Sequence, residues 1–182
     1  RDRDVTGVQT CALPIYIGWR ANRLAGGYKA YRHAVIDELA VLPAQFNWRV
    51  VCGMTGAGKS RLLRALAKAG AQVLDLEALA AHRGSVLGNL PGAPQPAQKM
   101  FESLVWHALR TFDRARPVFV ESESKKIGNL RTPEALIEAM WAADCINLSA
   151  PTELRVPMLM HEYVHLVRDP AALGEQIGRA HV

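Results

Sequence analysis

The chain has 182 residues, 49% of them hydrophobic and 21% charged, a balance that suits one globular domain with a substantial core. No apolar run is long enough to span a bilayer and no signal peptide is evident, so we expect no membrane association. The net charge of +5 permits a polyanionic partner, although the basic residues are scattered and no basic tract resembles a nucleic-acid arm.

Both ends of the chain resemble translated sequencing-adaptor DNA. Residues 10–15 can be encoded by ACGTGTGCTCTTCCGATC, and the reverse complement of this string contains the codons for Ile177 to Val182. One oligonucleotide read from opposite strands therefore explains both ends, and we exclude them from the fold. The predicted division is an adaptor-derived segment at 1–15, the remnant of an upstream domain with its linker at 16–30, a main domain at 31–176 and a second adaptor-derived segment at 177–182.

The main domain is predicted to open with a helix from Tyr31 to Leu42, which Pro43 ends. The apolar run from Trp48 to Cys52 then suits a buried strand. Residues 53–60 read G-x-x-x-x-G-K-S, the pattern of a phosphate-binding P-loop, and good helix formers follow as far as Lys68. Strand, glycine loop and helix are the context that this motif requires, which argues against a chance match in a flexible loop.

The P-loop residues have separate predicted tasks. Its glycines let the backbone curl so that successive N–H groups point at phosphate oxygens. The start of the following helix adds a partial positive charge, Lys59 reaches the terminal phosphates, and Ser60 offers a hydroxyl to a magnesium ion. The predicted phosphate-binding residues are Gly53, Thr55, Gly56, Gly58, Lys59 and Ser60.

Strands and helices continue to alternate after the P-loop helix. The predicted elements are a strand at 72–75, a short helix at 76–81, a loop at 82–95, a helix at 97–112, a strand at 117–120, a helix at 133–143, a strand at 145–148 and a helix at 153–167 that Pro157 opens or kinks. This alternation predicts an α/β, P-loop NTPase-like three-layer domain with a mostly parallel sheet. Ligands of such domains bind at the carboxyl ends of the strands, where the P-loop lies.

Two pairs of carboxylates fall at those strand ends. Asp75 and Glu77 follow the second strand, where they could orient a substrate or a metal-bound water, or could simply balance a helix dipole. Glu121 and Glu123 end a buried apolar strand, the position at which P-loop proteins hold an acidic magnesium partner. A role in a surface turn is the alternative, but a carboxylate emerging from a buried strand is costly without a partner.

Two polar segments, His82–Ser85 and Gln95–Lys99, bracket the long predicted loop. Their arginine and lysine could grip phosphates and their glutamines could read polar edges, while loop capping and solvation is the alternative. The three cysteines share no metal-ligand spacing, and we expect Cys52 and Cys145 to be buried reduced thiols, which favours the cytoplasm. For the pair His161 and His165 a solvated helix face is expected.

Six motifs occur in an order that resembles the C-terminal part of the bacterial tRNA 2-selenouridine synthase family. They are LAGGYKAYR at 24–32, GMTGAGKS at 53–60, VLDLE at 73–77, HRGS at 82–85, QPAQK at 95–99 followed by Phe101-Glu102, and VESESKKIG at 120–128. The resemblance covers roughly residues 17–167, and the HRGS and ESESKKIG strings are far more specific than the P-loop.

This resemblance implies an enzyme with an N-terminal rhodanese-like domain, whose cysteine acts in cis with the P-loop domain. The family replaces sulfur by selenium in wobble 2-thiouridine of tRNA, with selenophosphate as donor, and geranylates the sulfur with geranyl diphosphate. The implied candidate substrate or tRNA contacts are Asp75, Glu77, His82, Arg83, Ser85, Gln95, Gln98, Lys99, Glu121, Glu123, Lys125 and Lys126.

The chain departs from the family pattern because the cysteine loop of the rhodanese domain is absent from it. We therefore expect this fragment to keep only the functions that face phosphate and tRNA, and to be inactive alone in selenation. Two alternatives stay open: a small-molecule kinase of the P-loop class that uses a nucleotide with magnesium, and a non-catalytic nucleotide-binding module.

Overall fold

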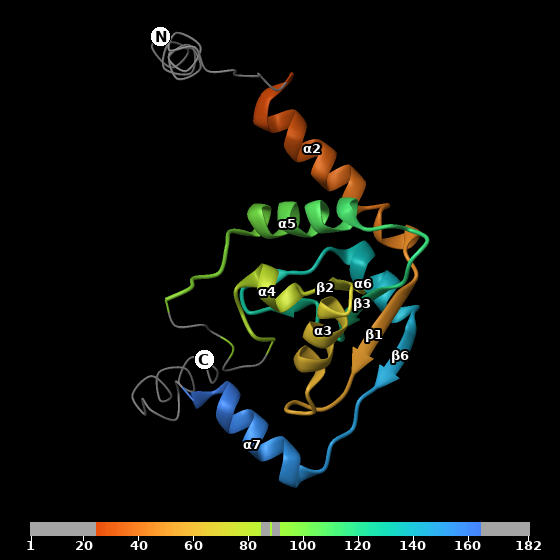
Figure 1. Ribbon diagram of the computed structural model, residues 1–182. Coiled ribbons are helices and arrows are strands. Elements are labelled where there is room, and N and C mark those ends of the chain that lie inside the picture. Colours follow the sequence, from red (N-terminus) through yellow and green to blue (C-terminus); the bar gives the residue numbers. More distant parts are fainter. Residues whose placement is uncertain (1–24, 85–87, 89–91, 165–182) are drawn as a thin grey trace, which may run out of the picture. The chain divides into compact units, whose positions relative to one another are not determined.

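The computed structural model describes residues 25–84, 88 and 92–164, so the predicted adaptor-derived segments lie outside the described residues (Figure 1). The chain divides into two compact units, residues 1–34 and residues 35–182. The first unit contains the start of helix α2 (Gly27–Leu39), where the rings of Tyr28 and Tyr31 lie 6.0 Å apart. No helix among the described residues is long and apolar enough to cross a membrane.

The second unit is built on a four-stranded parallel sheet in the order β2-β3-β1-β6. Its strands are β1 (Trp48–Cys52), β2 (Gln72–Leu74), β3 (Val118–Glu121) and β6 (Asp144–Asn147). All four predicted strands are present, with ends that differ by at most one residue. The strand that leads into the P-loop pairs directly with β3, with Val51 opposite Glu121, so the P-loop and the carboxylates after β3 share one edge.

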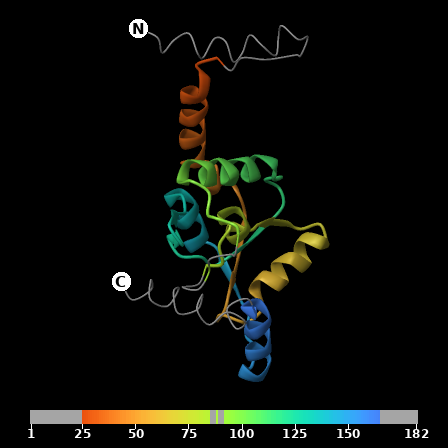
Figure 2. The same ribbon diagram turned by 90° about the vertical axis from the view of Figure 1, so that its left-hand side faces the viewer.

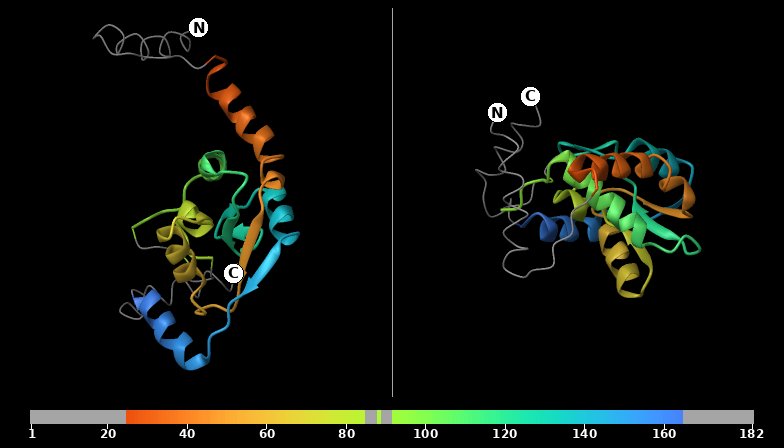
Figure 3. Two further views of the ribbon diagram at one scale, coloured as in Figure 1. Left: turned by 45° about the vertical axis from the view of Figure 1, so that its right-hand side comes forward. Right: turned by 90° about the horizontal axis from the view of Figure 1, so that it is seen from above.

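Helices cover both faces of this sheet, as predicted. They are α3 (Lys59–Lys68), α4 (Leu76–Ala80), α5 (Gln98–Thr111), α6 (Glu134–Trp141) and α7 (Thr152–Glu162), with a short 3₁₀ helix η1 (Pro43–Gln45) after α2. The connection from β1 to β2 runs one way along the sheet and the next two crossovers run the other way. Right-handed crossovers therefore place α3 on one face and α5 and α6 on the other, and Figure 3 shows α3 and α6 on opposite sides of the strands.

The two faces of the sheet are packed unequally. From α5 and α6, six side chains are buried: Phe101, Val105, Leu109, Leu136, Ile137 and Met140. On the other face α3 buries only Leu63, and it stands out from the sheet in Figure 2. Since a helix that buries one residue offers most of its surface to solvent, α3 has room for residues that packing does not require.

A short hairpin, with two residues in each strand, follows β3 and was not predicted. Its strands are β4 (Lys126–Ile127) and β5 (Leu130–Arg131), and Gly128 turns the chain with a φ of +59°. Ile127 and Leu130 are buried beneath it, so the hairpin is part of the core.

The helix predicted at 153–167 is present as α7, which runs from Thr152 to Glu162 with Pro157 inside it, and residues 165–167, with His165, lie outside the described residues. The expectation for the two strand cysteines is wrong. Cys52 and Cys145 are not buried reduced thiols, because they lie on neighbouring strands and are joined by a disulfide. Strand β6 is at the edge of the sheet and all four of its residues are exposed, a position that apolar composition alone cannot reveal.

Candidate functional site

The P-loop leaves β1 and wraps round the start of α3. Gly56 and Gly58 have φ values of +79° and +92°, in the left-handed region that only glycine enters readily, and Gly58 is the N-cap of α3. A Cβ on Gly53 would collide with the carbonyl oxygen of Leu148, so close backbone approach also requires glycine there. The helix therefore begins at Lys59 with its first N–H groups directed at the loop.

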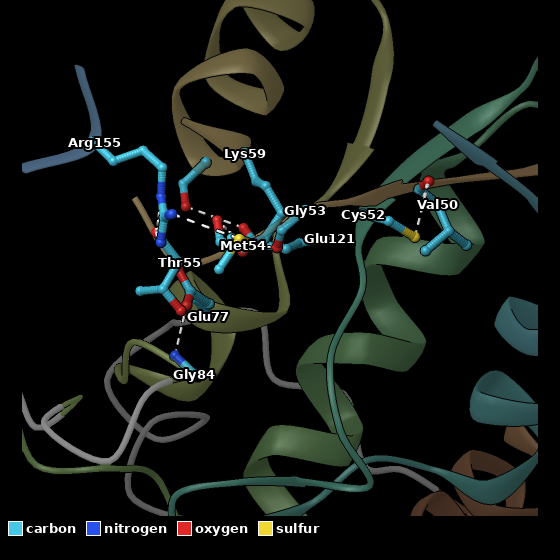
Figure 4. A network of polar contacts seen from close by, with 11 residues as sticks. Val50, Cys52, Gly53, Met54, Thr55, Lys59, Glu77, Gly84, Glu121 and Arg155 are labelled. Atoms are coloured by element: carbon cyan, nitrogen blue, oxygen red, sulfur yellow. Dashed lines mark hydrogen bonds and ion pairs between the residues drawn. The ribbon is translucent and has the colours of Figure 1, made fainter. Parts of the chain in front are cut away.

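Lys59 and Ser60 both contact the carboxylate at the end of β3, and Figure 4 shows Lys59 beside Glu121. The Nζ of Lys59 donates to the carbonyl oxygen of Gly53 at 2.9 Å and lies 3.4 Å from Oε1 of Glu121. The Oγ of Ser60 donates to the other oxygen of Glu121 at 3.0 Å. The side chains of Lys59 and Glu121 are each only 12% exposed, so this ion pair is shielded from bulk water.

Glu121 belongs to a cluster of three carboxylates. One oxygen each from Glu77, Glu121 and Glu123 lies within 4.8 Å of the others, and oxygen ligands of this kind suit a hard divalent cation such as Mg²⁺. The backbone N–H of Gly84 donates to Glu77 and holds its carboxylate in place. Asp75 has a different task, since its Oδ1 accepts the N–H of Ala78 at 2.9 Å and caps α4.

Burial and mutual repulsion favour the protonated forms of two of these carboxyls. Burial raises the pKa of Glu123 to about 8, with the negative charges of Glu77 and Glu121 adding to the effect and Lys59 opposing it. Burial also raises the pKa of Glu77, against the hydrogen bond from Gly84. At neutral pH Glu123 therefore holds a proton, at a position where a bound cation would otherwise supply the positive charge.

The HRGS segment lies beside this cluster. His82 is 5% exposed, its Nδ1 has no hydrogen-bond partner among the described residues, and burial lowers its pKa, so the ring is neutral at pH 7. Arg83 lies over the ring of Tyr163 at 5.3 Å. A Cβ on Gly84 would meet the carboxylate of Glu123, which explains why glycine stands there. Ser85 lies outside the described residues.

The two glutamines of the QPAQK motif hold the hairpin, as the alternative of loop capping required. Gln95 donates to the carbonyl oxygen of Ile127 at 2.9 Å and accepts the N–H of Asn129 at 2.8 Å. Gln98 bonds both backbone groups of Arg131, each at 2.8 Å. Their amides are thus engaged by backbone groups of the hairpin, and a contact with the substrate stays a prediction.

The three lysines proposed as substrate or tRNA contacts are not among the described residues that line the cleft at the P-loop. Lys99 is exposed in the first turn of α5 and Lys126 is exposed on β4. Lys125 forms an ion pair with Glu134 at 2.8 Å and lies over the ring of Trp141 at 5.0 Å. These lysines belong to the surface around the hairpin.

The cleft has a volume of about 1060 Å³, and two helices contribute walls that the sequence did not suggest. Arg61 and Arg64 of α3 line it, as do Met158 and His161 of α7, so His161 faces the cleft rather than lying on a purely solvated helix face. The only feature of the sequence that pointed to Arg61 and Arg64 as cleft residues is their position directly after the P-loop.

Helix α7 also contacts the P-loop itself. Arg155 donates through Nε and Nη2 to the carbonyl oxygen of Thr55, at 3.1 and 3.0 Å, across a hundred residues of sequence. A Cβ on Gly56 would lie 2.8 Å from Cγ of Leu159, so the helix packs directly on the loop. Nothing local in the sequence of α7 indicated this contact.

Comparison with known proteins gives a consistent family. The family model described as tRNA 2-selenouridine synthase AAA domain matches residues 46–181, which include most of the C-terminal segment predicted to be adaptor-derived. The tRNA 2-selenouridine synthase of Aeromonas salmonicida (strain A449) is 39% identical over 160 residues, 86% of this chain and 42% of that protein. Those of Hydrogenovibrio crunogenus and Alcanivorax borkumensis are also 39% identical, over 78% and 81% of this chain and 40% of each relative. The chain thus spans about two fifths of the length of these relatives, and no solved structure matches it.

Proposed function

Because this chain belongs to the tRNA 2-selenouridine synthase family, we propose that it is the P-loop portion of an enzyme that converts wobble 2-thiouridine in tRNA to 2-selenouridine. Selenophosphate is the proposed selenium donor, and geranylation of the sulfur by geranyl diphosphate is the proposed intermediate step. Family membership does not favour the two alternatives, a small-molecule kinase and a non-catalytic nucleotide-binding module.

The observation that carries this proposal is the convergence of Lys59, Ser60 and the backbone of the P-loop on one edge of the cleft. The ammonium of Lys59 is held by the Gly53 carbonyl oxygen and by Glu121. A phosphate oxygen is a stronger acceptor than a carbonyl oxygen, so a diphosphate in the loop would take over the hydrogen bond from Gly53. Glu121 then keeps the lysine aimed at the ligand.

The same groups suit the chemistry of geranyl transfer. When the sulfur of 2-thiouridine bonds to the first carbon of the geranyl chain, the carbon–oxygen bond breaks and diphosphate leaves with its electron pair. Lys59 and the N–H groups at the start of α3 would stabilise the negative charge that develops on the departing diphosphate. The proposed role of the P-loop is therefore to bind the diphosphate tail and to stabilise it as it leaves.

Magnesium fits this site as far as its donors are concerned. Ser60 and Glu121 would hold the ion, with Glu77 and Glu123 within reach of the same position. When bound, Mg²⁺ would neutralise part of the diphosphate charge. The proton on Glu123 would have to leave before this carboxyl could contribute as a ligand.

The remaining partners are proposed from the family. The intact enzyme would act on tRNA in the cytoplasm, with a rhodanese-like domain in cis that supplies an activated cysteine. In the part of the chain that the structure describes, Cys52 and Cys145 are bonded to each other, so neither provides a thiolate. We expect the 182-residue chain alone to make no 2-selenouridine from thiolated tRNA and selenophosphate; detection of that product would assign the selenium chemistry to this chain.

Calorimetric titration of the 182-residue chain tests the phosphate site. We expect geranyl diphosphate and inorganic pyrophosphate to bind, and Lys59→Ala to weaken both by about 10–100-fold, since charge-assisted hydrogen bonds contribute about 1.5–3 kcal/mol. Lys126→Ala, which removes an exposed lysine on β4, is the matched control and should keep full affinity. Equal affinities in the two variants would exclude the P-loop as the diphosphate site, and tighter binding of ATP with phosphoryl transfer to a hydroxyl acceptor would favour a kinase.

A further inference from the structure

We propose that the exposed face of α3 is a docking surface for the phosphodiester backbone of an RNA strand. The bound strand would run along α3 toward the cleft. This inference rests on the proposed function in taking RNA as the substrate, but it assigns a surface that the proposed function leaves open. The docking surface consists of Arg61, Arg64 and Lys68.

The charged side chains of α3 are all positive. Its ten residues include Lys59, Arg61, Arg64 and Lys68 but no aspartate or glutamate. Arg61, Arg64 and Lys68 are all exposed, and their spacing of three and four residues places them on one side of the helix. Seven residues of helix extend about 10 Å, which is long enough for the row to contact more than one phosphate of a single strand.

Lys68 lies in the last turn of α3, where a positive charge complements the macrodipole, but the stability of the fold does not account for Arg61 and Arg64. A helix N-terminus carries a partial positive charge, so Arg61 in the first turn opposes the macrodipole. Packing imposes no requirement either, because Leu63 is the only residue of α3 that is buried. A helix former without charge would serve the fold at least as well at positions 61 and 64.

The docking surface is continuous with the cleft. Arg61 and Arg64 line the cleft together with Lys59 and the carboxylates, whereas Lys68 lies at the other end of α3. Beyond Lys68, a guanidinium nitrogen of Arg116 donates to the carbonyl oxygen of Gly70 at 2.6 Å, which brings a further cation to this end. Asp113 lies in the same loop as Arg116, accepts the N–H of Ala115 and keeps a negative charge there. The row of positive charge that leads to the P-loop is therefore that of Lys68, Arg64 and Arg61 on α3 itself.

The chemistry of the row selects a polyphosphate chain as the partner. Arginine forks bind phosphate oxygens in pairs, and a linear row of cations on a protruding helix suits a linear polyanion. In Figure 2 α3 projects away from the sheet, and residues of α7 line the same cleft as Arg61 and Arg64. An RNA strand lying along α3 would deliver a base to the cleft while its phosphates contact Arg61, Arg64 and Lys68.

The test is binding of the full 182-residue chain to unmodified tRNA, measured by fluorescence anisotropy over a series of salt concentrations. Each lost phosphate contact should reduce the slope of log K against log[salt] by about 0.7–0.9. We expect a reduction of that size for Lys68→Gln and about three times as much for the triple variant Arg61→Gln, Arg64→Gln, Lys68→Gln. Arg110→Gln on α5, on the other face of the sheet, changes the same formal charge as Lys68→Gln and should leave the slope unchanged.

A second measurement separates this inference from the proposed function. Lys68 does not line the cleft, so Lys68→Gln should keep full affinity for pyrophosphate while its tRNA slope falls. Equal slopes for Lys68→Gln and Arg110→Gln would overturn the docking surface even if pyrophosphate binds as proposed. Absence of any tRNA binding by the chain, or tighter binding to anionic phospholipid vesicles with the same dependence on α3, would overturn it as well.

Discussion

Replacing Glu123 by glutamine should remove a pH dependence of stability that this carboxyl imposes. The pKa of Glu123 is raised from its ordinary value of 4.5 to about 8 in the folded protein. Below pH 4.5 the carboxyl is protonated in both the folded and unfolded states. Between about pH 4.5 and pH 8 only the folded state retains the proton, so the stability contributed by this group is lost as the pH rises through that window, and above it the loss is complete.

The magnitude follows from one proton over that window. A difference of one bound proton changes the free energy of unfolding by about 1.4 kcal/mol per pH unit, which sets an upper bound of about 5 kcal/mol. Because the carboxyl is only partly buried, solvent screening reduces this to about 2 kcal/mol. Glu123→Gln keeps the shape of the side chain and cannot ionise, so its stability relative to wild type should rise by that amount from pH 5 to pH 8.5.

Urea denaturation of the two proteins at pH 5, 6, 7 and 8.5 measures this difference directly. Glu138→Gln, which removes an exposed carboxylate from α6, is the control and should follow the wild-type profile. If Glu123→Gln and wild type lose stability in parallel across the window, the carboxyl is ionised throughout and our description of the cluster is wrong.

Four further outcomes are expected. Mg²⁺ should stabilise the wild-type chain more at pH 8.5 than at pH 6 in thermal melts, because it competes with the proton on Glu123; an equal shift would place the ion elsewhere. Gly84→Ala should cost about 1–3 kcal/mol in denaturation experiments, because the new methyl group meets the Glu123 carboxylate; a neutral outcome would show that the cluster can open. Arg155→Ala should weaken pyrophosphate binding about fivefold by calorimetry, since about 1 kcal/mol of hydrogen bonding to the Thr55 carbonyl oxygen is lost, and Arg155→Lys should restore only part of it. Deleting residues 1–15 and 177–182 should leave the melting temperature nearly unchanged, and a large fall would refute the adaptor interpretation.

The parts of the site that the sequence could predict are those encoded within a few residues. The P-loop is such a case, since its glycines, Lys59 and Ser60 lie between an apolar strand and a run of good helix formers. The predicted meeting of Glu121 with this loop depended only on the rule that parallel strands align their carboxyl ends. The structure confirms the fold and brings Glu121 to Lys59, while the ligand itself stays a proposal.

The parts that could not be predicted depend on strand order and long-range contacts. The apolar run at 145–148 predicts a strand but not that it lies at the sheet edge, so the sequence predicts a buried Cys145, whereas β6 lies at the edge and is exposed. The contact of Arg155 with Thr55 joins residues a hundred positions apart. The hairpin was missed because strands of two residues are too short to show any alternation. The row of cations on α3 was also missed, because Arg61, Arg64 and Lys68 are scattered in the sequence and share one side only once the helix forms.

The hydrogen bonds of Gln95 to the hairpin have a consequence for how the two most specific motifs behave together. Gln95 closes the loop that starts at His82, and it grips Ile127 and Asn129 just after the carboxylates of β3. A Cβ on Gly128 would press on the ring of His82, so the hairpin also abuts the HRGS segment. Gln95 and the hairpin therefore join the HRGS segment to the segment bearing Glu123 by direct contacts. Substitutions at Gln95 and Gly128 should show strong epistasis rather than additive effects, and a homologue that changes one partner must compensate at the other.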